Sequence, residues 1–503
     1  MNKAKRAWLG ILLLALGVLL TLHASRRYTE KRYIVDAGSC RMEVLSTERA
    51  DPAPAAEHDA VVLFHGIAAN KTVMNFVART FAEMGMRVYT PDLPGHGRSP
   101  GPFTPAQAEA CSESLVRGLA ARGMIYPEHT ILAGHSMGAA IAIQVAEKFR
   151  PAGVVAISPA PMVPANGVSP ENLLFQARPK LAPYTLVMVG TLEPRWLTAN
   201  AAALVAANSS STVRYEEMKW NSHVSVLFSR AVAREAQKWA AQALRLPVAD
   251  WRLPSRANLI GGAAGLLGIL LLAGPFLREM LGKEPAEEAR PAHLPSAMRM
   301  VVECAVVSLA AVGILKYWEP LRFVHLFEGG YLASFFLIVG AVLLALHWGI
   351  AREQLPVKGK FLVGAAVAGI VLHLLVTGWL ELTMTEAWMT AWRWLRFPLF
   401  FVAAFIFLYA LEVLVGPATL SRHRIAQALV LVTIGWLAVA AGVLFFRSGE
   451  ILLVLLVPYF GLCFGFTYVG AQLVRRLTAS ATAAALFGAI LVAGFCVALF
   501  PLS

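Results

Sequence analysis

The hydrophobic residues of this chain follow two different patterns. In residues 28–252, short apolar runs alternate with longer stretches in which apolar residues recur at helical spacing. In residues 1–27 and 253–503, the apolar runs are long enough to cross a bilayer, which takes about 20 helical residues. The patterns predict an N-terminal membrane anchor or signal segment over 1–27, a globular domain over 28–252, and a transmembrane domain of about eight helices over 253–503.

The globular part is predicted to hold a mostly parallel sheet. Its short runs are rich in apolar and β-branched residues, and most of the later ones alternate with helical stretches, which is typical of a sheet with helices on both faces. The predicted fold class is therefore α/β for this domain, joined to an all-α polytopic transmembrane domain. Reactive groups in such sheets collect where the strands end. The predicted strands are Tyr33–Val35, Arg41–Leu45, Ala60–Phe64, Arg87–Thr90, Thr130–Ala133, Val154–Ile157, Thr185–Val189 and Val213–Tyr215.

Nine apolar segments are candidate membrane spans. The first serves either as an anchor or, because Leu22-His23-Ala24 resembles a cleavage site, as a signal peptide. The outer loop Glu381–Arg396 contains Trp388, Trp392 and Trp394, and suits a headgroup layer where it would help to present lipid. The nine segments run approximately over Trp8–Leu22, Leu259–Leu277, Met300–Leu315, Tyr331–Ile350, Phe361–Leu380, Phe397–Val415, Ile425–Phe446, Ile451–Val474 and Ala481–Phe500.

Composition fits a membrane protein better than a nucleic-acid-binding one. The 503 residues are 57% hydrophobic and only 15% charged. The net charge of +13 comes without an aromatic-studded basic face, which is the usual footprint of nucleic-acid binding. Membrane lipids are therefore expected partners, and nucleic acid is not.

The basic residues also predict an orientation. With the N-terminus cytoplasmic, fourteen Lys and Arg residues lie in the tail and loops on that side, and five lie in the short outer loops, as the positive-inside rule requires. We therefore expect a multi-pass protein of the cell membrane with an extracytoplasmic globular domain, periplasmic if the source is bacterial. Six basic residues that flank this domain oppose the rule: Arg26, Arg27, Lys31, Arg32, Arg252 and Arg256.

The cysteines and histidines do not indicate a metal site. No C-x-x-C motif and no clustered His/Cys spacing is present, so neither a metal nor another cofactor is expected. Cys40 and Cys111 are the only cysteines of the exported part, where a disulfide is permitted. Whether the two lie close together does not follow from the sequence.

One serine occupies a position typical of a nucleophile. Ser136, in Gly134-His135-Ser136-Met137-Gly138, lies between the predicted strand that ends at Ala133 and a helical stretch that begins at Ala139. The flanking glycines leave room for a strained turn and for close packing of helix on strand, as in a nucleophile elbow. Met137, directly after this serine, and Ile67, directly after His65-Gly66 at another strand end, would provide the backbone N–H groups of an oxyanion hole.

Three motifs together resemble the α/β-hydrolase superfamily. They are Phe64-His65-Gly66, the segment from Val88 to Ser99 that contains Asp92-Leu93-Pro94-Gly95-His96-Gly97, and Gly134 to Gly138. Within the superfamily they are most similar to the branch of monoacylglycerol lipases, lysophospholipases and S33 aminopeptidases. The resemblance covers about the first half of the globular part and does not extend into the membrane part. It implies an α/β-hydrolase fold and a chain order of serine, acid and histidine.

The resemblance also assigns the remaining candidate catalytic residues. Glu193, in Gly190-Thr191-Leu192-Glu193-Pro194, takes the position of the acid, where the family usually has aspartate. His223 follows the last strand and would act as the general base. His96, His135 and Asp92 recur in the family motifs and are expected to shape turns rather than to react. Glu216, Glu217 and Asp250 remain alternatives for the acid.

These observations favour a membrane-integrated serine hydrolase. It would cleave carboxylic esters of a lipid or another acylated envelope molecule through an acyl-enzyme on Ser136. The segment where relatives carry a lid is short and proline-rich, so no large helical cap is expected between residues 158 and 184. A serine peptidase or an acyltransferase would use the same triad. A transporter or scaffold with a hydrolase-like binding domain is the other alternative, which a polar cavity joining His373 to Glu412 would favour.

Overall fold

The computed structural model describes residues 3–503 except residues 39, 52–58, 165–172, 176–179, 248, 283–294, 416–421 and 446–450. The chain forms two compact units. The first, called the α/β unit, comprises Gly17–Ala263, Leu380–Glu386 and Pro501–Ser503. The second, called the helical unit, comprises Met1–Leu16, Ala264–Trp379 and Ala387–Phe500.

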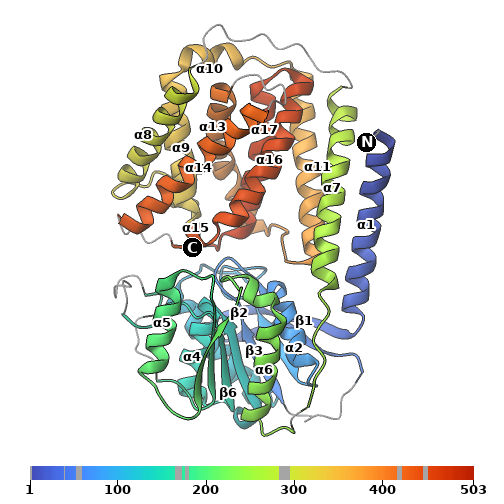
Figure 1. Ribbon diagram of the computed structural model, residues 1–503, viewed down its shortest axis with the longest axis vertical. Helices are drawn as coiled ribbons and strands as arrows, with labels where there is room; N and C mark the ends of the chain where they lie inside the picture. Colours follow the sequence, from blue (N-terminus) through green and yellow to red (C-terminus); the bar gives the residue numbers. More distant parts are fainter. Residues whose placement is uncertain are drawn as a thin grey trace. The chain divides into compact units, whose positions relative to one another are not determined.

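One eight-stranded sheet forms the centre of the α/β unit (Figure 1). The strand order is β1-β2-β4-β3-β5-β6-β7-β8. β2 pairs antiparallel with β1 and with β4, and all other neighbours pair in parallel. The predicted α/β class with a mostly parallel sheet is therefore confirmed. The strands are β1 (Tyr28–Ala37), β2 (Cys40–Arg49), β3 (Ala60–Phe64), β4 (Arg87–Pro91), β5 (Thr130–His135), β6 (Gly153–Ile157), β7 (Thr185–Gly190) and β8 (Val213–Met218).

All eight predicted runs lie within strands, but the first two strands are longer than predicted. β1 and β2 form a hairpin at the edge of the sheet, paired from Tyr28–Arg49 to Ala37–Cys40. Charged residues fill many of their positions, and a large part of β1 is exposed. An edge strand does not need a continuous apolar run, so the hydrophobic pattern marks only the inner part of this hairpin.

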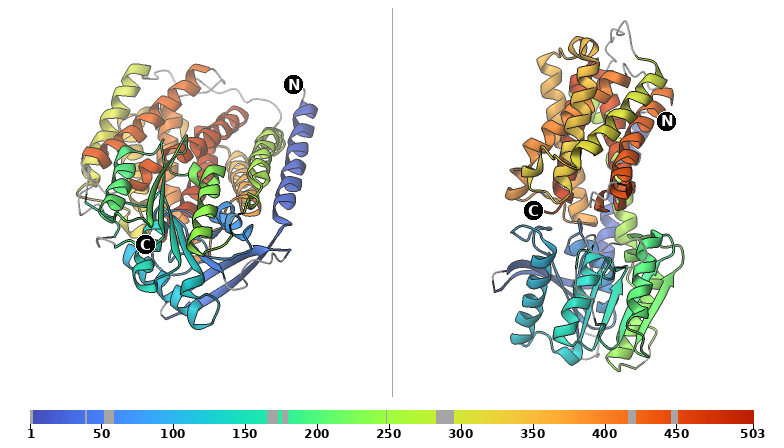
Figure 2. Two further views of the ribbon diagram at one scale, coloured as in Figure 1. Left: turned by 60° about the horizontal axis from the view of Figure 1, so that its bottom comes forward. Right: turned by 90° about the vertical axis from the view of Figure 1, so that its left-hand side faces the viewer.

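Helices cover both faces of the sheet (Figure 2). α2 packs against α6, and their apolar side chains share one core with alternate residues of the central strands, such as Val61 and Leu63. α3 and α4 pack against each other, and α4 also packs on β5 and β6. The helices of this unit are η1 (Lys71–Met74), α2 (Asn75–Ala82), α3 (Pro105–Ala121), η2 (Pro127–His129), α4 (Met137–Phe149), α5 (Arg195–Ala206), η4 (Ser225–Phe228) and α6 (Arg230–Ala243).

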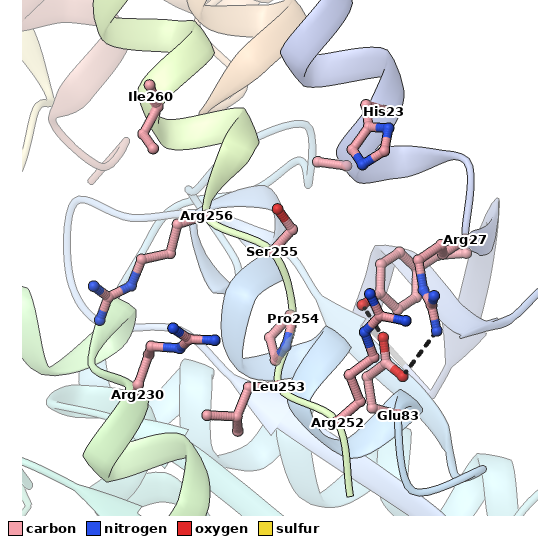
Figure 3. Close-up of a pocket in the computed structure, with 12 residues that line it drawn as sticks. His23, Arg27, Glu83, Arg230, Arg252, Leu253, Pro254, Ser255, Arg256 and Ile260 are labelled. Carbon is pink, nitrogen blue, oxygen red and sulfur yellow. Dashed lines mark hydrogen bonds and ion pairs between the residues drawn. The ribbon is translucent and has the colours of Figure 1, made fainter.

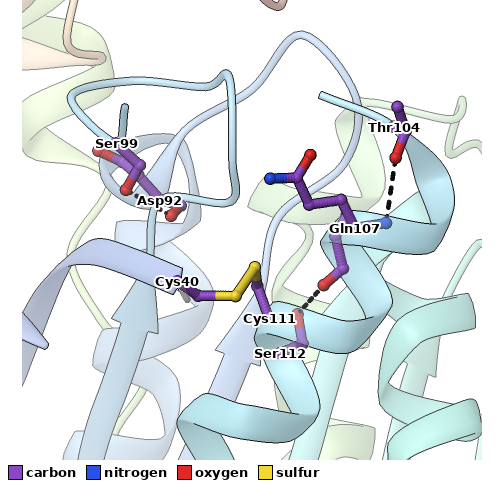
Figure 4. Close-up of a disulfide and its surroundings, with 8 residues drawn as sticks. Cys40, Asp92, Ser99, Thr104, Gln107, Cys111 and Ser112 are labelled. Atoms are coloured by element: carbon purple, nitrogen blue, oxygen red, sulfur yellow. Dashed lines mark hydrogen bonds between the residues drawn. A yellow bond between two sulfur atoms is a disulfide. The ribbon is translucent and has the colours of Figure 1, made fainter. Parts of the chain in front are cut away.

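A disulfide joins Cys40 at the start of β2 to Cys111 in α3 (Figure 4). The two Cα atoms lie 5.4 Å apart and the residues are separated by 71 positions in sequence. The bridge therefore ties the edge hairpin to a helix on one face of the sheet. It also fits a protein domain that folds in an oxidising compartment.

We expect the double variant Cys40→Ser/Cys111→Ser to lose about 4 kcal/mol of unfolding free energy, because a bridge over 71 residues restricts the unfolded chain strongly. Urea unfolding of both proteins, with and without a reductant, measures the effect. Reductant should destabilise the wild type to the level of the variant and leave the variant unchanged. A wild type whose reduction is verified chemically but whose unfolding midpoint does not move would contradict the expectation.

The helical unit contains several long apolar helices. Among the residues that the structure describes, eight helices are long and apolar enough to cross a membrane: α1, α7, α8, α9, α11, α13, α14 and α17. They are compatible with a multi-pass membrane protein. The helices are α1 (Lys3–Ser25), α7 (Ala257–Leu281), α8 (Ala297–Leu315), η5 (Arg322–Val324), α9 (Gly329–Leu346), α10 (Trp348–Gln354), α11 (Gly359–Thr383), α12 (Ala391–Trp394), α13 (Phe397–Val415), α14 (Arg422–Phe445), α15 (Ile451–Leu455), α16 (Val457–Thr478) and α17 (Ala481–Leu499).

Two predicted spans are not single helices. Tyr331–Ile350 is divided at His347, because α9 ends at Leu346 and α10 begins at Trp348. Ile451–Val474 is divided as well. α15 ends at Leu455 and α16 begins at Val457. Pro458 lies in the first turn of α16, where its missing N–H needs no helical partner, whereas inside a continuous helix it would break the backbone ladder. The prediction of one continuous helix was wrong because it counted hydrophobicity and gave no weight to this proline.

Glu412, which lies in the long apolar helix α13, is paired. Its carboxylate lies 2.8 Å from the buried guanidinium of Arg475 and accepts a hydrogen bond of 2.8 Å from Gln472. A small pocket of about 20 Å³ adjoins Glu412, and His373 does not line it. Packing and charge neutralisation are sufficient to account for Glu412. This pocket does not form the polar connection between Glu412 and His373 that would favour the transporter alternative.

Candidate active site

Ser136 lies at a sharp turn between β5 and α4. Its backbone angles, φ 53° and ψ −119°, are strained for any residue with a side chain and cost about 1–3 kcal/mol. Hydrogen bonds hold the turn: Ser136 N–H donates to the Ile157 carbonyl at 2.9 Å, and the Ser136 carbonyl accepts from Ala160 N–H at 3.0 Å. This geometry exposes the hydroxyl beyond the end of the strand, as a nucleophile elbow does.

The two glycines of the motif are required by close packing. A Cβ atom on Gly134 would lie 2.1 Å from the Gly138 carbonyl oxygen. A Cβ atom on Gly138 would lie 2.2 Å from the Phe64 carbonyl oxygen. Both distances are far below van der Waals contact, so α4 approaches β3 and β5 this closely only with glycine at both positions.

Ser136, His223 and Glu193 form a continuous hydrogen-bond chain. The Ser136 Oγ lies 3.0 Å from Nε2 of His223, and Nδ1 of His223 lies 2.8 Å from Oε2 of Glu193. With Nδ1–H donating to the carboxylate, Nε2 carries a lone pair toward the serine hydroxyl. The three residues come from the ends of β5 and β7 and from the segment after β8, far apart in sequence. The arrangement can deprotonate the serine as it attacks an acyl group.

Glu193 is fixed by three donors. Oε1 accepts hydrogen bonds from the Gly190 N–H at 2.6 Å and from the Ser158 hydroxyl at 2.5 Å, and Oε2 faces His223. Burial opposes ionisation, but the hydrogen bonds from His223, Ser158 and Gly190 outweigh it and lower the pKa of Glu193 below its ordinary value. The carboxylate is therefore charged and held at one orientation.

The alternative acids lie elsewhere. Glu216 pairs with Arg214 at 2.5 Å, and Glu217 accepts from the Tyr215 hydroxyl at 3.2 Å, both on the edge strand β8. Asp250 is paired with Arg234 and its side chain is 89% exposed. None of these contacts involves His223, so the structure favours Glu193 as the third member of the candidate triad.

The proposed oxyanion donors border the serine. Met137 is the first residue of α4, and the chain at Gly66 runs so close that an added Cβ would lie 3.1 Å from the Ser136 Cβ. In the part of the chain that the structure describes, the N–H groups of Ile67 and Met137 have no hydrogen-bond acceptor. Two backbone donors beside a nucleophile suit a developing oxyanion.

Two buried histidines hold the loops around this site. His65 Nδ1–H donates to the Gly66 carbonyl at 2.8 Å, and its Nε2 accepts from the Leu93 N–H at 3.0 Å. His135 Nε2–H donates to the carbonyl of His223 at 2.7 Å. Burial lowers the pKa of His135 to about 3, so it stays neutral and acts as a fixed donor. Both histidines shape turns, which is the role the sequence predicts for His135.

Asp92 braces two loops, as predicted, and belongs to a buried cluster that the sequence did not reveal. Its carboxylate accepts from the N–H groups of Lys71 at 2.8 Å and Arg98 at 2.9 Å. The Lys71 Nζ, which is fully buried, lies 2.5 Å from Asp92, 2.6 Å from Glu386 and 3.1 Å from Glu43. We call these four residues the Lys71 cluster. Glu386 lies 315 positions from Lys71, so no sequence motif connects them.

The segment Leu380–Glu386 is tied to the loop that follows the candidate oxyanion residue Ile67. Asn70 Nδ2 donates to the Thr385 hydroxyl and to the Glu386 carbonyl, each at 2.9 Å, and Glu386 N–H donates to the Thr72 hydroxyl at 2.9 Å. The sequence had assigned this segment to the headgroup layer together with Trp388, Trp392 and Trp394. Thr385 and Glu386 are thus fixed within the α/β unit, and the three tryptophans are 45–57% exposed. The placement of this loop in a headgroup layer stays a prediction.

No lid helix is present among the described residues between β6 and β7, and residues 165–172 and 176–179 of this insertion lie outside them. Over the residues that the structure describes, no group of three or more His, Cys, Asp or Glu side chains is arranged to hold a metal ion.

Comparison with known proteins points to the same fold. A family described as "Alpha/beta hydrolase family" matches residues 61–314, about half of the chain. Similar solved structures include a predicted hydrolase from Thermoplasma acidophilum, 19% identical, covering 44% of this chain and 100% of its own, with a TM-score of 0.33. Another is an α/β serine hydrolase without a lid from Xanthomonas campestris, 16% identical, covering 44% and 96%, with a TM-score of 0.34. Among curated protein sequences, no match was found.

Proposed function

The chain belongs to the alpha/beta hydrolase family, and on this premise we propose that it is a membrane-integrated serine hydrolase that cleaves carboxylic esters through an acyl-enzyme on Ser136. The observation that carries the proposal is the hydrogen-bond chain from Ser136 Oγ through His223 to Glu193, at 3.0 and 2.8 Å. It starts from a serine whose backbone is strained into an elbow.

The reaction follows from these contacts. Ser136 Oγ attacks the ester carbonyl while His223 Nε2 accepts its proton, and Glu193 stabilises the imidazolium. The N–H groups of Ile67 and Met137 donate to the tetrahedral oxyanion. Its collapse expels the alcohol, which takes the proton from His223. Water, deprotonated by the same imidazole, then attacks the acyl-enzyme and releases the carboxylic acid.

The substrate is proposed to be a lipid or another acylated molecule at the outer face of the cell membrane. Eight long apolar helices are compatible with a multi-pass membrane protein, and the motifs around Ser136 are similar to those of monoacylglycerol lipases and lysophospholipases. The disulfide and the asymmetry of basic loop residues support an extracytoplasmic α/β unit. An amide substrate or an acceptor other than water would use the same residues.

Labelling with a fluorophosphonate probe tests the proposal. We expect the purified full-length protein to be labelled covalently on the peptide that contains Ser136, and to release carboxylic acid from short-chain esters and monoacyl lipids. Product analysis separates hydrolysis from acyl transfer. A folded protein that neither reacts with the probe nor turns over any ester would contradict the proposal. It would favour the alternative of a transporter or scaffold with a hydrolase-like binding domain.

Ser158 is expected to position Glu193. Replacing it by alanine removes the 2.5 Å hydrogen bond to Oε1, and a bond to a charged group contributes about 1.5–3 kcal/mol. We therefore expect kcat of Ser158→Ala to fall about tenfold, with the acidic limb of its pH profile moved to higher pH because Glu193 loses a donor that lowers its pKa.

The matched control is Ser112→Ala, which removes a buried hydroxyl that donates to the Ala108 carbonyl within α3. Its kcat and pH profile should equal those of the wild type. A Ser158→Ala variant with reduced kcat but an unmoved acidic limb would assign Ser158 to general packing and not to the orientation and charge of Glu193.

A further inference from the structure

A cavity of about 470 Å³ lies in the α/β unit, at the ends of two apolar helices (Figure 3). Its walls come from the last residues of α1, the start of β1, the first residue of α6, and the segment that leads into α7. The basic side chains among its lining residues are His23, Arg27, Arg230, Arg252 and Arg256. No residue of the candidate triad lines it.

The walls of the cavity carry an excess of positive charge. Glu83 is the one acidic residue among its lining residues, and it is already engaged, accepting from the Tyr28 hydroxyl at 2.7 Å and pairing with Arg27 at 3.5 Å. Within the described chain, no carboxylate lies within 4.0 Å of Arg230, Arg252 or Arg256. Three uncompensated guanidinium groups around one cavity attract an anion.

The guanidinium chemistry selects the kind of anion. Arginine presents several N–H donors in a planar fork that matches phosphate and carboxylate oxygens. The Nε of Arg27 is buried and has no hydrogen-bond partner, and Arg256 is held over the ring of Phe76 at 5.9 Å. Several forks around one space suit a tetrahedral phosphate, which offers oxygens in several directions.

The surroundings select a lipid as the source of that phosphate. Leu22 near the end of α1 is 58% exposed and Ile260 in the first turn of α7 is 62% exposed. α1 and α7 pack closely there, since a Cβ on Gly261 would lie 2.7 Å from the Gly17 carbonyl oxygen. Exposed apolar side chains on two membrane-type helices provide a surface for acyl chains directly beside the arginines.

This site would also explain an anomaly in the charge distribution. Arg27, Arg252 and Arg256 are three of the six basic residues that oppose the positive-inside rule on the outer side. Another of the six, Arg32, pairs with Glu386 at 3.3 Å. Four of these six basic residues therefore have a local role, either in an ion pair or in the wall of this cavity. Their presence on the outer side does not have to follow from the positive-inside rule.

We propose that this cavity binds the phosphate headgroup of an anionic membrane phospholipid, with the acyl chains on the exposed faces of α1 and α7. The bound lipid would fasten the α/β unit at the membrane surface. The proposal concerns binding alone and does not depend on the chemistry of Ser136.

Binding is measured on the full-length protein in lipid nanodiscs or mixed micelles that contain a fluorescent phosphatidylglycerol. Unlabelled phosphatidylglycerol and, in a separate titration, phosphatidylcholine compete with this reporter lipid. A basic residue near a membrane surface contributes about fivefold to affinity for an anionic lipid. We expect the triple variant Arg230→Gln/Arg252→Gln/Arg256→Gln to bind phosphatidylglycerol about 100-fold more weakly than the wild type, with little change for phosphatidylcholine.

The matched control is Arg117→Gln/Arg150→Gln/Arg195→Gln, which removes the same charge from exposed positions of the α/β unit outside the cavity. It should bind phosphatidylglycerol as the wild type does. Thermal unfolding in phosphatidylcholine checks that both triple variants are folded. Equal weakening in the two triple variants would overturn the site. Inorganic phosphate at millimolar concentration should not displace the lipid, and displacement would assign the cavity to a soluble anion instead.

Discussion

Replacing Ser136 by alanine is expected to abolish ester hydrolysis, with a loss of kcat of about 10⁵-fold or more. The variant loses the attacking oxygen itself, and only binding and the N–H groups of Ile67 and Met137 remain, which leave a small residual rate over water in hydrolases of this kind. The measurement is the turnover of a chromogenic short-chain ester and of a monoacyl lipid by equal amounts of folded protein, together with fluorophosphonate labelling.

A second variant at the same position separates chemistry from strain. Ser136→Gly also lacks the hydroxyl, but glycine adopts φ 53° and ψ −119° without the steric penalty that serine and alanine share. We expect both variants to be inactive and the glycine variant to be about 1 kcal/mol more stable than the alanine variant, once the greater entropy of unfolded glycine is included. Appreciable hydrolysis by either variant would place the nucleophile elsewhere.

The sequence predicted the central sheet well because buried parallel strands leave a clear trace. β3, β5, β6 and β7 are wholly buried, so each appears as an uninterrupted apolar run. The candidate triad was also accessible, because chain order and strand ends restrict which residues can meet Ser136. The structure brings His223 and Glu193 to it, and their catalytic role stays a prediction until it is tested.

What the sequence did not show depends on contacts between distant segments. The bond between Cys40 and Cys111 needed the position of α3 beside the edge hairpin. The pairing of Lys71 with Glu386 joins a loop after β3 to the residues that follow α11, and neither segment carries a motif. The cavity lined by arginines likewise brings together side chains from several separate segments. In the sequence, each of these arginines looks like an ordinary exposed residue.

Replacing Lys71 by methionine is expected to destabilise the α/β unit by about 3–5 kcal/mol. The variant would leave Asp92 and Glu386 buried beside each other without the ammonium group that lies 2.5 and 2.6 Å from them, and removing one partner of a buried ion pair has costs of this size. Thermal and urea unfolding of the full-length protein in one detergent measure the loss.

Lys148→Met is the matched control. Lys148 lies 2.6 Å from Glu113, the same distance as Lys71 from Glu386, but the Lys148 side chain is 55% exposed. Exposed pairs contribute about 0–1 kcal/mol, so this variant should be nearly as stable as the wild type. Equal effects of the two substitutions would show that burial of the Lys71 cluster adds nothing to stability. If Lys71→Met yields no folded protein, the milder Glu386→Gln variant carries the test.

Glu386 should make the stability of the α/β unit depend on pH in a defined direction. Burial, together with the nearby Asp92, raises the pKa of Glu386 from 4.5 to about 7. Between these values the folded protein holds a proton that the unfolded chain has released, so the unfolding free energy falls as pH rises from about 4.5 to 7 and levels off above. Asp92 has a lowered pKa and acts in the opposite direction only near and below its ordinary value of 3.8.

The Glu386→Gln variant isolates this contribution, because glutamine keeps the shape of the side chain but does not titrate. We expect the wild type to lose stability relative to the variant between pH 5 and pH 7, and the difference to stay constant from about pH 8 upward. Urea midpoints of both proteins at intervals of one pH unit measure the difference, and histidines elsewhere affect the two proteins equally. Parallel profiles across the whole range would mean that Glu386 is ionised in the folded protein throughout, with Lys71 and Arg32 together compensating its burial.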